Sequence, residues 1–185
     1  DWMFYGASAF DQDLGGWAVH NVTDMVRMFG GASAFDQDIS DWAVDSVTAM
    51  WEMFRGASAF NGDIGGWAVD SVTTMDCMFC SASSFNQDIS GWDTSGVLNM
   101  KSMFGSTAFN QDISGWAVQS VTDMVSMFNG ASAFNQDLGW CVDNGVDLTD
   151  AFYNTLCAST SCGVIQVADV AGCPTPSPTP RPTSA

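Results

Sequence analysis

The chain has 185 residues, 46% of them hydrophobic, and it carries four Lys and Arg against 21 Asp and Glu, for a formal net charge of −17. This length and apolar content suffice for a buried core, but so few basic side chains exclude the positive surface that nucleic-acid backbones and anionic membranes attract. No apolar run reaches the length of a membrane span, so we expect neither nucleic acid nor a membrane-spanning segment.

A repeat of about 25 residues begins near the start of the sequence and continues to about residue 138. Tryptophan marks it at Trp17, Trp42, Trp67, Trp92, Trp116 and Trp140. Phenylalanine marks it twice, for example at Phe35 and Phe54, and the step shortens to 24 residues near positions 106 and 139. A fixed period in this range is typical of a solenoid, in which each unit buries its apolar face against its neighbours.

Two elements are expected in each repeat. Trp42 and Val44 alternate with small or polar residues, which favours a short strand with these side chains facing inward. Met50, Met53 and Phe54 are spaced i, i+3, i+4 and would share one face of a short helical turn. The pattern therefore predicts an α/β solenoid over residues 1–138 with one short parallel strand and one short helical turn per coil. The Trp and Met columns are expected to fill its core.

The segments Phe-Asn-Gln-Asp-Ile-Ser-Gly-Trp at 109–116 and Val-Thr-Asp-Met-Val-Ser-Met-Phe at 121–128 resemble the repeat of BspA-like leucine-rich-repeat surface proteins. The resemblance covers roughly residues 3–138 and implies a leucine-rich-repeat-like, right-handed solenoid of about six coils. It also implies a secreted or surface-displayed protein, commonly linked to adhesion. Val47 stands where the usual leucine-rich pattern has Asn, so the asparagine ladder of that family is not expected here.

An aspartate column is the sharpest candidate for a binding site. It contains Asp13, Asp38, Asp63, Asp88, Asp112 and Asp137. Beside it runs a mixed column of Asp11, Asp36, Asn61, Asn86, Asn110 and Asn135. The favoured interpretation is that each carboxylate of the first column accepts backbone N–H bonds in its own turn. The alternative is calcium held between successive coils by carboxylate oxygens, and calcium is the one cofactor considered.

The cysteines fall into two groups. Cys77 and Cys80 have Cys-x-x-Cys spacing, and a local surface disulfide is favoured. Zinc would need four ligands, and thioredoxin-like redox chemistry would need a βαβ context that the pattern lacks. The second group contains Cys141, Cys157, Cys162 and Cys173. We expect these four to pair among themselves, in one of three connectivities, within a C-terminal cap at residues 139–173. Residues 164–170 could form a strand that covers the end of the stack.

Residues 174–185 contain every proline of the chain and predict an extended Pro/Thr/Ser-rich tail. Candidate glycosylation sites are Asn21, in the sequon Asn-Val-Thr, and Thr175, Ser177, Thr179 and Thr183 in the tail. Together with the even number of cysteines, these features predict an extracellular or cell-surface protein.

No catalytic or organic-cofactor-binding residues are expected. His20 is the single histidine, and nothing in its column supplies a nucleophile, so an enzyme is not predicted. We expect a structural or adhesive repeat protein, and the alternative is a module that binds glycan or calcium on its outer face. The sequence opens within a repeat, so we expect either further repeats before residue 1 or a second subunit, such as a copy of the chain in a filament, over that end.

Overall fold

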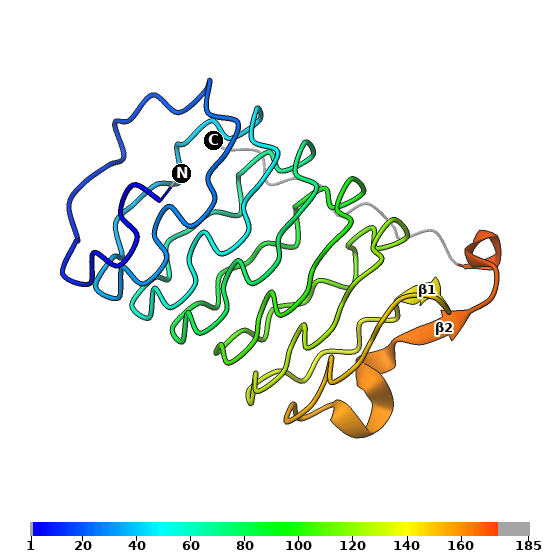
Figure 1. The fold of residues 1–185 in the computed structure, drawn as a ribbon. Helices are drawn as coiled ribbons and strands as arrows, with labels where there is room; N and C mark the ends of the chain where they lie inside the picture. Colours follow the sequence, from blue (N-terminus) through cyan, green and yellow to red (C-terminus); the bar gives the residue numbers. More distant parts are fainter. Residues whose placement is uncertain (1, 174–185) are drawn as a thin grey trace.

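The computed structural model describes residues 2–173, and within them successive repeats lie on one another as layers. Figure 1 shows the chain passing through one layer after another, from the N-terminal repeat in blue toward the C-terminal segment in orange. Each sequence column therefore becomes a row of side chains along the molecule. Every internal layer is closed on both sides by its neighbours.

The predicted fold class, an α/β, leucine-rich-repeat-like solenoid of about six coils with a strand and a helical turn in each, is wrong. The described residues contain two strands and two 3-10 helices, and all four lie between residues 141 and 172. The repeats themselves consist of turns and extended connections. The regular pairing between neighbouring layers is limited to isolated parallel bridges, such as the one between Ala49 and Thr74.

The predicted helical turn fails because its backbone changes hand at Glu52. This residue has a φ of 54°, in the left-handed region, where a right-handed helix cannot continue. The equivalent residues of other layers have φ values from 53° to 56°: Arg27, Cys77, Ser102 and Ser126. The Met53 N–H donates to the Met50 carbonyl at 3.2 Å, so a single turn closes and no helix follows it.

The predicted strand around Trp42 and Val44 is a pair of reverse turns. The Trp42 N–H donates to the Ile39 carbonyl at 3.1 Å, and the Val47 N–H donates to the Val44 carbonyl at 2.9 Å. A strand leaves such groups free for a neighbouring strand, whereas a turn uses them locally. Inward and outward side chains still alternate, which is why the sequence pattern resembles that of a strand.

Backbone hydrogen bonds between layers hold the turn segment in register. The N–H groups of Met50, Glu52 and Phe54 donate to carbonyls of the next layer at 3.2, 2.9 and 2.9 Å. Thr48, just before this segment, accepts a hydrogen bond at its carbonyl from the Thr73 N–H of the next layer at 3.0 Å. Buried backbone groups need such partners, and here the neighbouring repeat supplies them.

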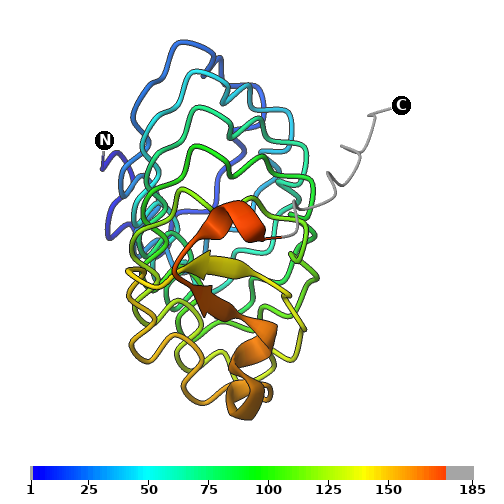
Figure 2. The same ribbon diagram turned by 90° about the vertical axis from the view of Figure 1, so that its right-hand side faces the viewer.

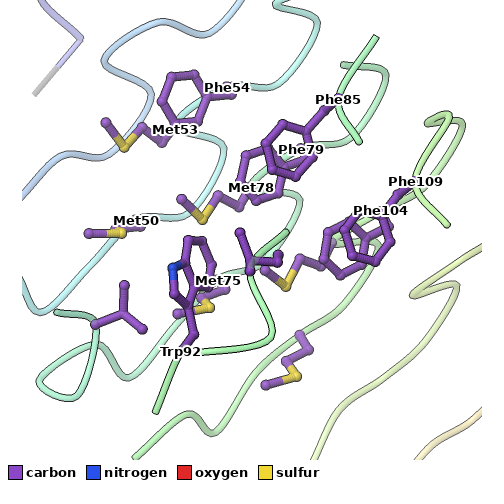
Figure 3. Packing of buried hydrophobic residues seen from close by; sticks show 14 of the residues in the cluster. Met50, Met53, Phe54, Met75, Met78, Phe79, Phe85, Trp92, Phe104 and Phe109 are labelled. Atoms are coloured by element: carbon purple, nitrogen blue, oxygen red, sulfur yellow. The ribbon is translucent and has the colours of Figure 1, made fainter. Parts of the chain in front are cut away.

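Stacked aromatic rings fill the interior of the layers (Figure 3). Within one layer, Phe79 and Phe85 stack with ring centroids 3.9 Å apart. Between layers, Phe54 and Phe79 stack at 5.7 Å with their planes 2° apart. Both phenylalanine columns and the methionines beside them, such as Met75, are fully buried in the internal layers. The apolar area removed from water is the main favourable contribution to this stack.

The tryptophan column faces the core, as predicted, in five of its six positions. Trp67 is 2% exposed, and its indole Nε1–H donates to the Ile39 carbonyl of the preceding layer at 3.2 Å. The same bond recurs at Trp42, Trp92, Trp116 and Trp140. Trp17, in the first repeat, is 41% exposed. The interpretation of the methionine column as core is also confirmed.

The C-terminal segment departs from the repeat. It contains strand β1 (Cys141–Asp143), 3-10 helix η1 (Ala158–Gly163), strand β2 (Ile165–Val167) and 3-10 helix η2 (Val170–Gly172). The two strands pair in parallel, and Figure 2 shows them against the last layer of the stack. β2 falls within the segment 164–170 for which the sequence predicts a strand.

Candidate functional site

The aspartate column closes tight turns on the surface of the stack. Asp38 Oδ1 accepts the Ser40 N–H at 3.0 Å and the Ser40 hydroxyl at 2.7 Å. These bonds stabilise the charged form and lower the pKa of Asp38, the hydroxyl contributing most. The same backbone bond, from the residue two positions later, is made to Asp13, Asp63, Asp88 and Asp112. The carboxylates therefore have a structural role in their own turns.

Asp137, the last of the column, lies against the C-terminal segment. Gly163 has a φ of 77°, and a Cβ there would collide with Asp137 Oδ1. Glycine is therefore needed at this contact for both its conformation and its size. Across residues 2–173, no group of three His, Cys, Asp or Glu side chains is placed to hold a metal ion. A shallow hollow of about 370 Å³ lies beside Asp13, Asp38 and Asp41.

The mixed Asp and Asn column forms a ladder between layers, which the sequence analysis missed. Asn86 Oδ1 accepts the N–H of Asn110, the equivalent residue of the next layer, at 2.8 Å. The bond recurs from Asp36 to Asp11, Asn61 to Asp36, Asn86 to Asn61 and Asn135 to Asn110. An Asn ladder is thus present, at a different column from the one occupied by Val47. The sequence does contain a signal for this ladder, because every residue of the column is Asp or Asn and carries a side-chain oxygen.

Glutamines strengthen this ladder. Gln111 Nε2–H donates to the Asn86 carbonyl at 2.9 Å and to its Oδ1 at 3.2 Å. Gln37, Gln87 and Gln136 make corresponding bonds to the layer before them. In the first repeat pair, the Gln37 amide, followed by the Asp36 N–H, lowers the pKa of Asp11. The ladder therefore commits these polar groups to contacts between layers.

A threonine row on another part of the surface is exposed and regular. The Thr48 hydroxyl donates to the Thr23 carbonyl at 3.2 Å, and the Thr73 hydroxyl donates to the Thr48 carbonyl at 3.3 Å. Leu98 interrupts the row and is 49% exposed. The methyl groups and hydroxyl oxygens of the threonines are repeated at the spacing of the layers, so the row presents the same chemical groups several times.

Cys77 and Cys80 are free, half-buried thiols, so the predicted disulfide between them is not formed in the structure. The Cys80 N–H donates to the Cys77 carbonyl at 3.1 Å, which closes the turn between them. A hydrogen bond from the Cys77 thiol, aided by the charge of Arg55, lowers the pKa of Cys80 to about 7 against the opposing effect of burial. The same hydrogen bond and burial raise the pKa of Cys77.

The four remaining cysteines form two disulfides, Cys141–Cys173 and Cys157–Cys162, one of the three pairings that the sequence left open. Asn21 is exposed in a turn. The other candidate glycosylation residues, Thr175, Ser177, Thr179 and Thr183, lie outside the described residues, as does the predicted tail. His20 is exposed, and its carbonyl accepts the Ser46 hydroxyl at 3.0 Å.

These layers, ladders and surface rows define a tandem-repeat protein whose units interact mainly with their sequence neighbours. Residues 1–81 and 62–163 each match the model of a family described as "Mycoplasma protein of unknown function, DUF285", and the chain belongs to this repeat family. Searches among curated proteins and among solved structures give no match. No helix in residues 2–173 has the length and apolar character that a membrane crossing requires.

Proposed function

We propose that the protein is a non-enzymatic, extracellular repeat protein with a structural or adhesive role. The observation that carries this proposal is the threonine row, in which Thr23, Thr48 and Thr73 present the same exposed groups in successive layers. A repeated surface favours several weak contacts with an extended partner, and linked weak contacts add up to strong attachment. Within residues 2–173, the Thr row and the Asp and Asn columns run along the stack from layer to layer.

The C-terminal disulfides support an extracellular location for this role. Disulfides persist in oxidising compartments and are rare in the cytosol. Cys141–Cys173 joins β1 to the residue after η2, and Cys157–Cys162 closes the turn around η1. The resemblance to BspA-like surface proteins favours the same location and an adhesive role.

The proposal extends to contacts between copies of the chain. The first described layer exposes four large apolar side chains: Trp2 (45%), Met3 (63%), Tyr5 (47%) and Trp17 (41%). Exposed apolar patches of this kind favour protein–protein contact. Light scattering over a range of concentrations would measure association, and the variant Trp2→Ser/Tyr5→Ser should reduce it. A chain that stays monomeric at all concentrations would remove this part of the proposal.

Adhesion can be tested with beads coated with the full chain and applied to cells and to glycan arrays. The variant Thr48→Lys/Thr73→Lys changes the charge and shape of the threonine row and should abolish most attachment. The control Ser159→Lys/Thr160→Lys adds the same charge to exposed residues of the C-terminal segment and should leave attachment unchanged. Equal loss in both variants would show a non-specific charge effect and contradict the proposal.

The second candidate is a module that binds glycan or calcium, and the hollow beside Asp13, Asp38 and Asp41 favours it. Calorimetric titration with calcium should then give heat in the wild type that is lost in Asp38→Asn. Asn keeps an oxygen acceptor for the Ser40 N–H, so this variant should still close its turn. Heat that is unchanged in Asp38→Asn would exclude calcium at this place.

A further inference from the structure

The turn at Cys77-Met-Phe-Cys80 is the one place in residues 2–173 where two free thiols occur together. Its hydrogen bond from the Cys80 N–H to the Cys77 carbonyl marks a four-residue turn, whose ends lie within about 7 Å of each other. Disulfides span Cα separations of about 4.4–6.8 Å, so the turn permits a bond between the two sulfurs. Both cysteine residues are half-buried.

Packing does not explain why cysteines occur at these two positions. The other layers place polar or small residues there: Arg27 and Gly30, Glu52 and Arg55, Ser102 and Gly105, Ser126 and Asn129. None of these pairs fills the core, which is formed by the neighbouring phenylalanine and methionine columns. The two thiols of this layer therefore add chemistry to a surface turn that folds without them elsewhere in the chain.

The surroundings of the turn favour a thiolate at Cys80. The Cys77 thiol and the Ser81 side chain both hydrogen-bond to it, and Arg55 of the preceding layer adds a positive charge. The negative charge of Glu52 opposes the effect of Arg55 on the pKa of Cys80, and the negative charge of Asp76 helps to raise the pKa of Cys77. Nucleophilic cysteines are found in such partly exposed places beside cationic groups.

Space for a reactant lies next to the turn. An open hollow of about 400 Å³ runs along glycines of the preceding layers to Arg55 and Ser81, the residue that follows Cys80. On the other side, the next layer carries Gly105, where even a Cβ would come within 3.9 Å of Cys80 Sγ. The hollow therefore reaches the residues on either side of Cys80 in space, Arg55 and Ser81.

We propose that Cys77 and Cys80 form a thiol–disulfide exchange site that accepts the disulfide of a low-molecular-weight thiol. The Cys80 thiolate attacks one sulfur of that disulfide, forms a mixed disulfide and releases the first small thiol, which takes up a proton. Cys77 then loses its proton to solvent, attacks Cys80 Sγ and releases the second small thiol. The two cysteines are oxidised by two electrons, and the small-molecule disulfide is reduced to two thiols. This inference does not depend on the adhesive role.

The site is tested on the full chain with oxidised glutathione or cystamine as the probe, followed by alkylation and peptide mapping. In the wild type, a Cys77–Cys80 disulfide should form without accumulation of an adduct. In Cys77→Ser, a stable mixed disulfide should accumulate on Cys80. In Cys80→Ser, the reaction of Cys77 at pH 7 should be at least about tenfold slower, because less of its thiol is ionised.

Charge variants separate a tuned site from two ordinary thiols. Arg55→Gln should slow the reaction of Cys80 several-fold at pH 7 and shift its pH profile upward. Lys101→Gln removes a positive charge from an exposed side chain that is not among the groups acting on Cys80, and should leave the rate of Cys80 unchanged. Equal rates for the two cysteines, no mixed disulfide in Cys77→Ser, or two thiols that stay free in the treated wild type would each overturn the proposal.

Discussion

The repeat layers and the C-terminal segment at residues 139–173 are stabilised in different ways. In the layers, ring columns and hydrogen bonds recur with the repeat, so each unit depends on its two neighbours. In the C-terminal segment, residues 146–153 still bond to the layer before them, as where the Phe128 N–H donates to the Ala151 carbonyl at 2.8 Å. Beyond them Leu156 and Ile165 are exposed, and two disulfides tie the chain together. A repeat unit is thus stabilised by contacts with equivalent neighbours, whereas the residues beyond the last unit are held by covalent links.

The largest expected effect is the loss of a buried ring from the stack. Trp67→Ala should lower the free energy of unfolding by about 3–5 kcal/mol, because it leaves a cavity and removes the indole hydrogen bond to Ile39. Urea denaturation measures the loss. The control Trp17→Ala alters the same column where the side chain is 41% exposed, and it should cost much less. Similar losses in both variants would contradict the layered core.

The second effect concerns the disulfides. Removing the Cys141–Cys173 link, with a sequence separation of 32, through Cys141→Ser/Cys173→Ser should cost about 3–4 kcal/mol. Cys157–Cys162, with a separation of 5, closes a shorter loop, and its removal should cost less. The rate of amide hydrogen exchange should then increase in β1 and β2 and change little near Trp67. An increase spread evenly over the layers would show that the two regions are not independently stabilised.

The side-chain ladder gives a smaller effect. Asn86→Ala removes the acceptor of the Asn110 N–H and one acceptor of Gln111, and should cost about 1–2 kcal/mol. Asn86→Asp keeps the acceptor oxygen, and Asp36 makes the same bond to Asn61. The Asp variant should therefore retain most of the stability in thermal denaturation. A loss as large as that of Asn86→Ala would show that the ladder is not built on the side-chain oxygen.

The smallest expected effect is a dependence of the stability on pH that arises at Glu52. Its bonds from Arg27 at 2.8 and 3.0 Å lower the pKa of Glu52 below its ordinary value of 4.5, against the opposing effect of burial. A carboxylate with a lowered pKa adds stability above its unfolded-state value, and that stability is lost as the pH falls through the folded-state value. Glu52→Gln should thus cost at most about 1 kcal/mol at pH 7, and the cost should shrink as the pH falls through the folded-state pKa.

The pKa of Asp76 is shifted in the opposite direction to that of Glu52, so Asp76 serves as the control. Burial raises its pKa, so its charged form disfavours the fold at neutral pH. Asp76→Asn should therefore be neutral or stabilising at pH 7, and its difference from the wild type should shrink toward pH 3. Parallel pH profiles for the two variants would contradict the assignment of these charges.

The sequence predicted the buried columns because apolar residues recur at a fixed step. Trp67 and Met75 were placed in the core on this ground alone. The predicted local conformation was wrong because the spacing of Met50 and Met53 fits a helical turn as well as it fits the single turn that the structure has. The left-handed backbone at Glu52 has no signal in the residue type, since such positions usually favour glycine or asparagine.

The candidate sites were predictable to different degrees. The turn bonds of Asp38 follow from the known preference of aspartate for turns, and this interpretation was favoured. The Asn86 ladder was not predicted, because the leucine-rich pattern places its asparagine at the position of Val47. The reduced state of Cys77 and Cys80 could not be derived from their spacing, which fits a disulfide and a free pair equally well.

The layered arrangement requires that equivalent residues of successive repeats lie side by side in parallel register. Ala49 and Thr74 are such partners. The direct test is oxidation of Ala49→Cys/Thr74→Cys in a chain whose Cys77 and Cys80 are replaced by Ser, compared with the pair Ala49→Cys/Asp76→Cys. We expect a rapid disulfide in the first pair and a much slower one in the second. Equal rates, or a link only in the second pair, would contradict it.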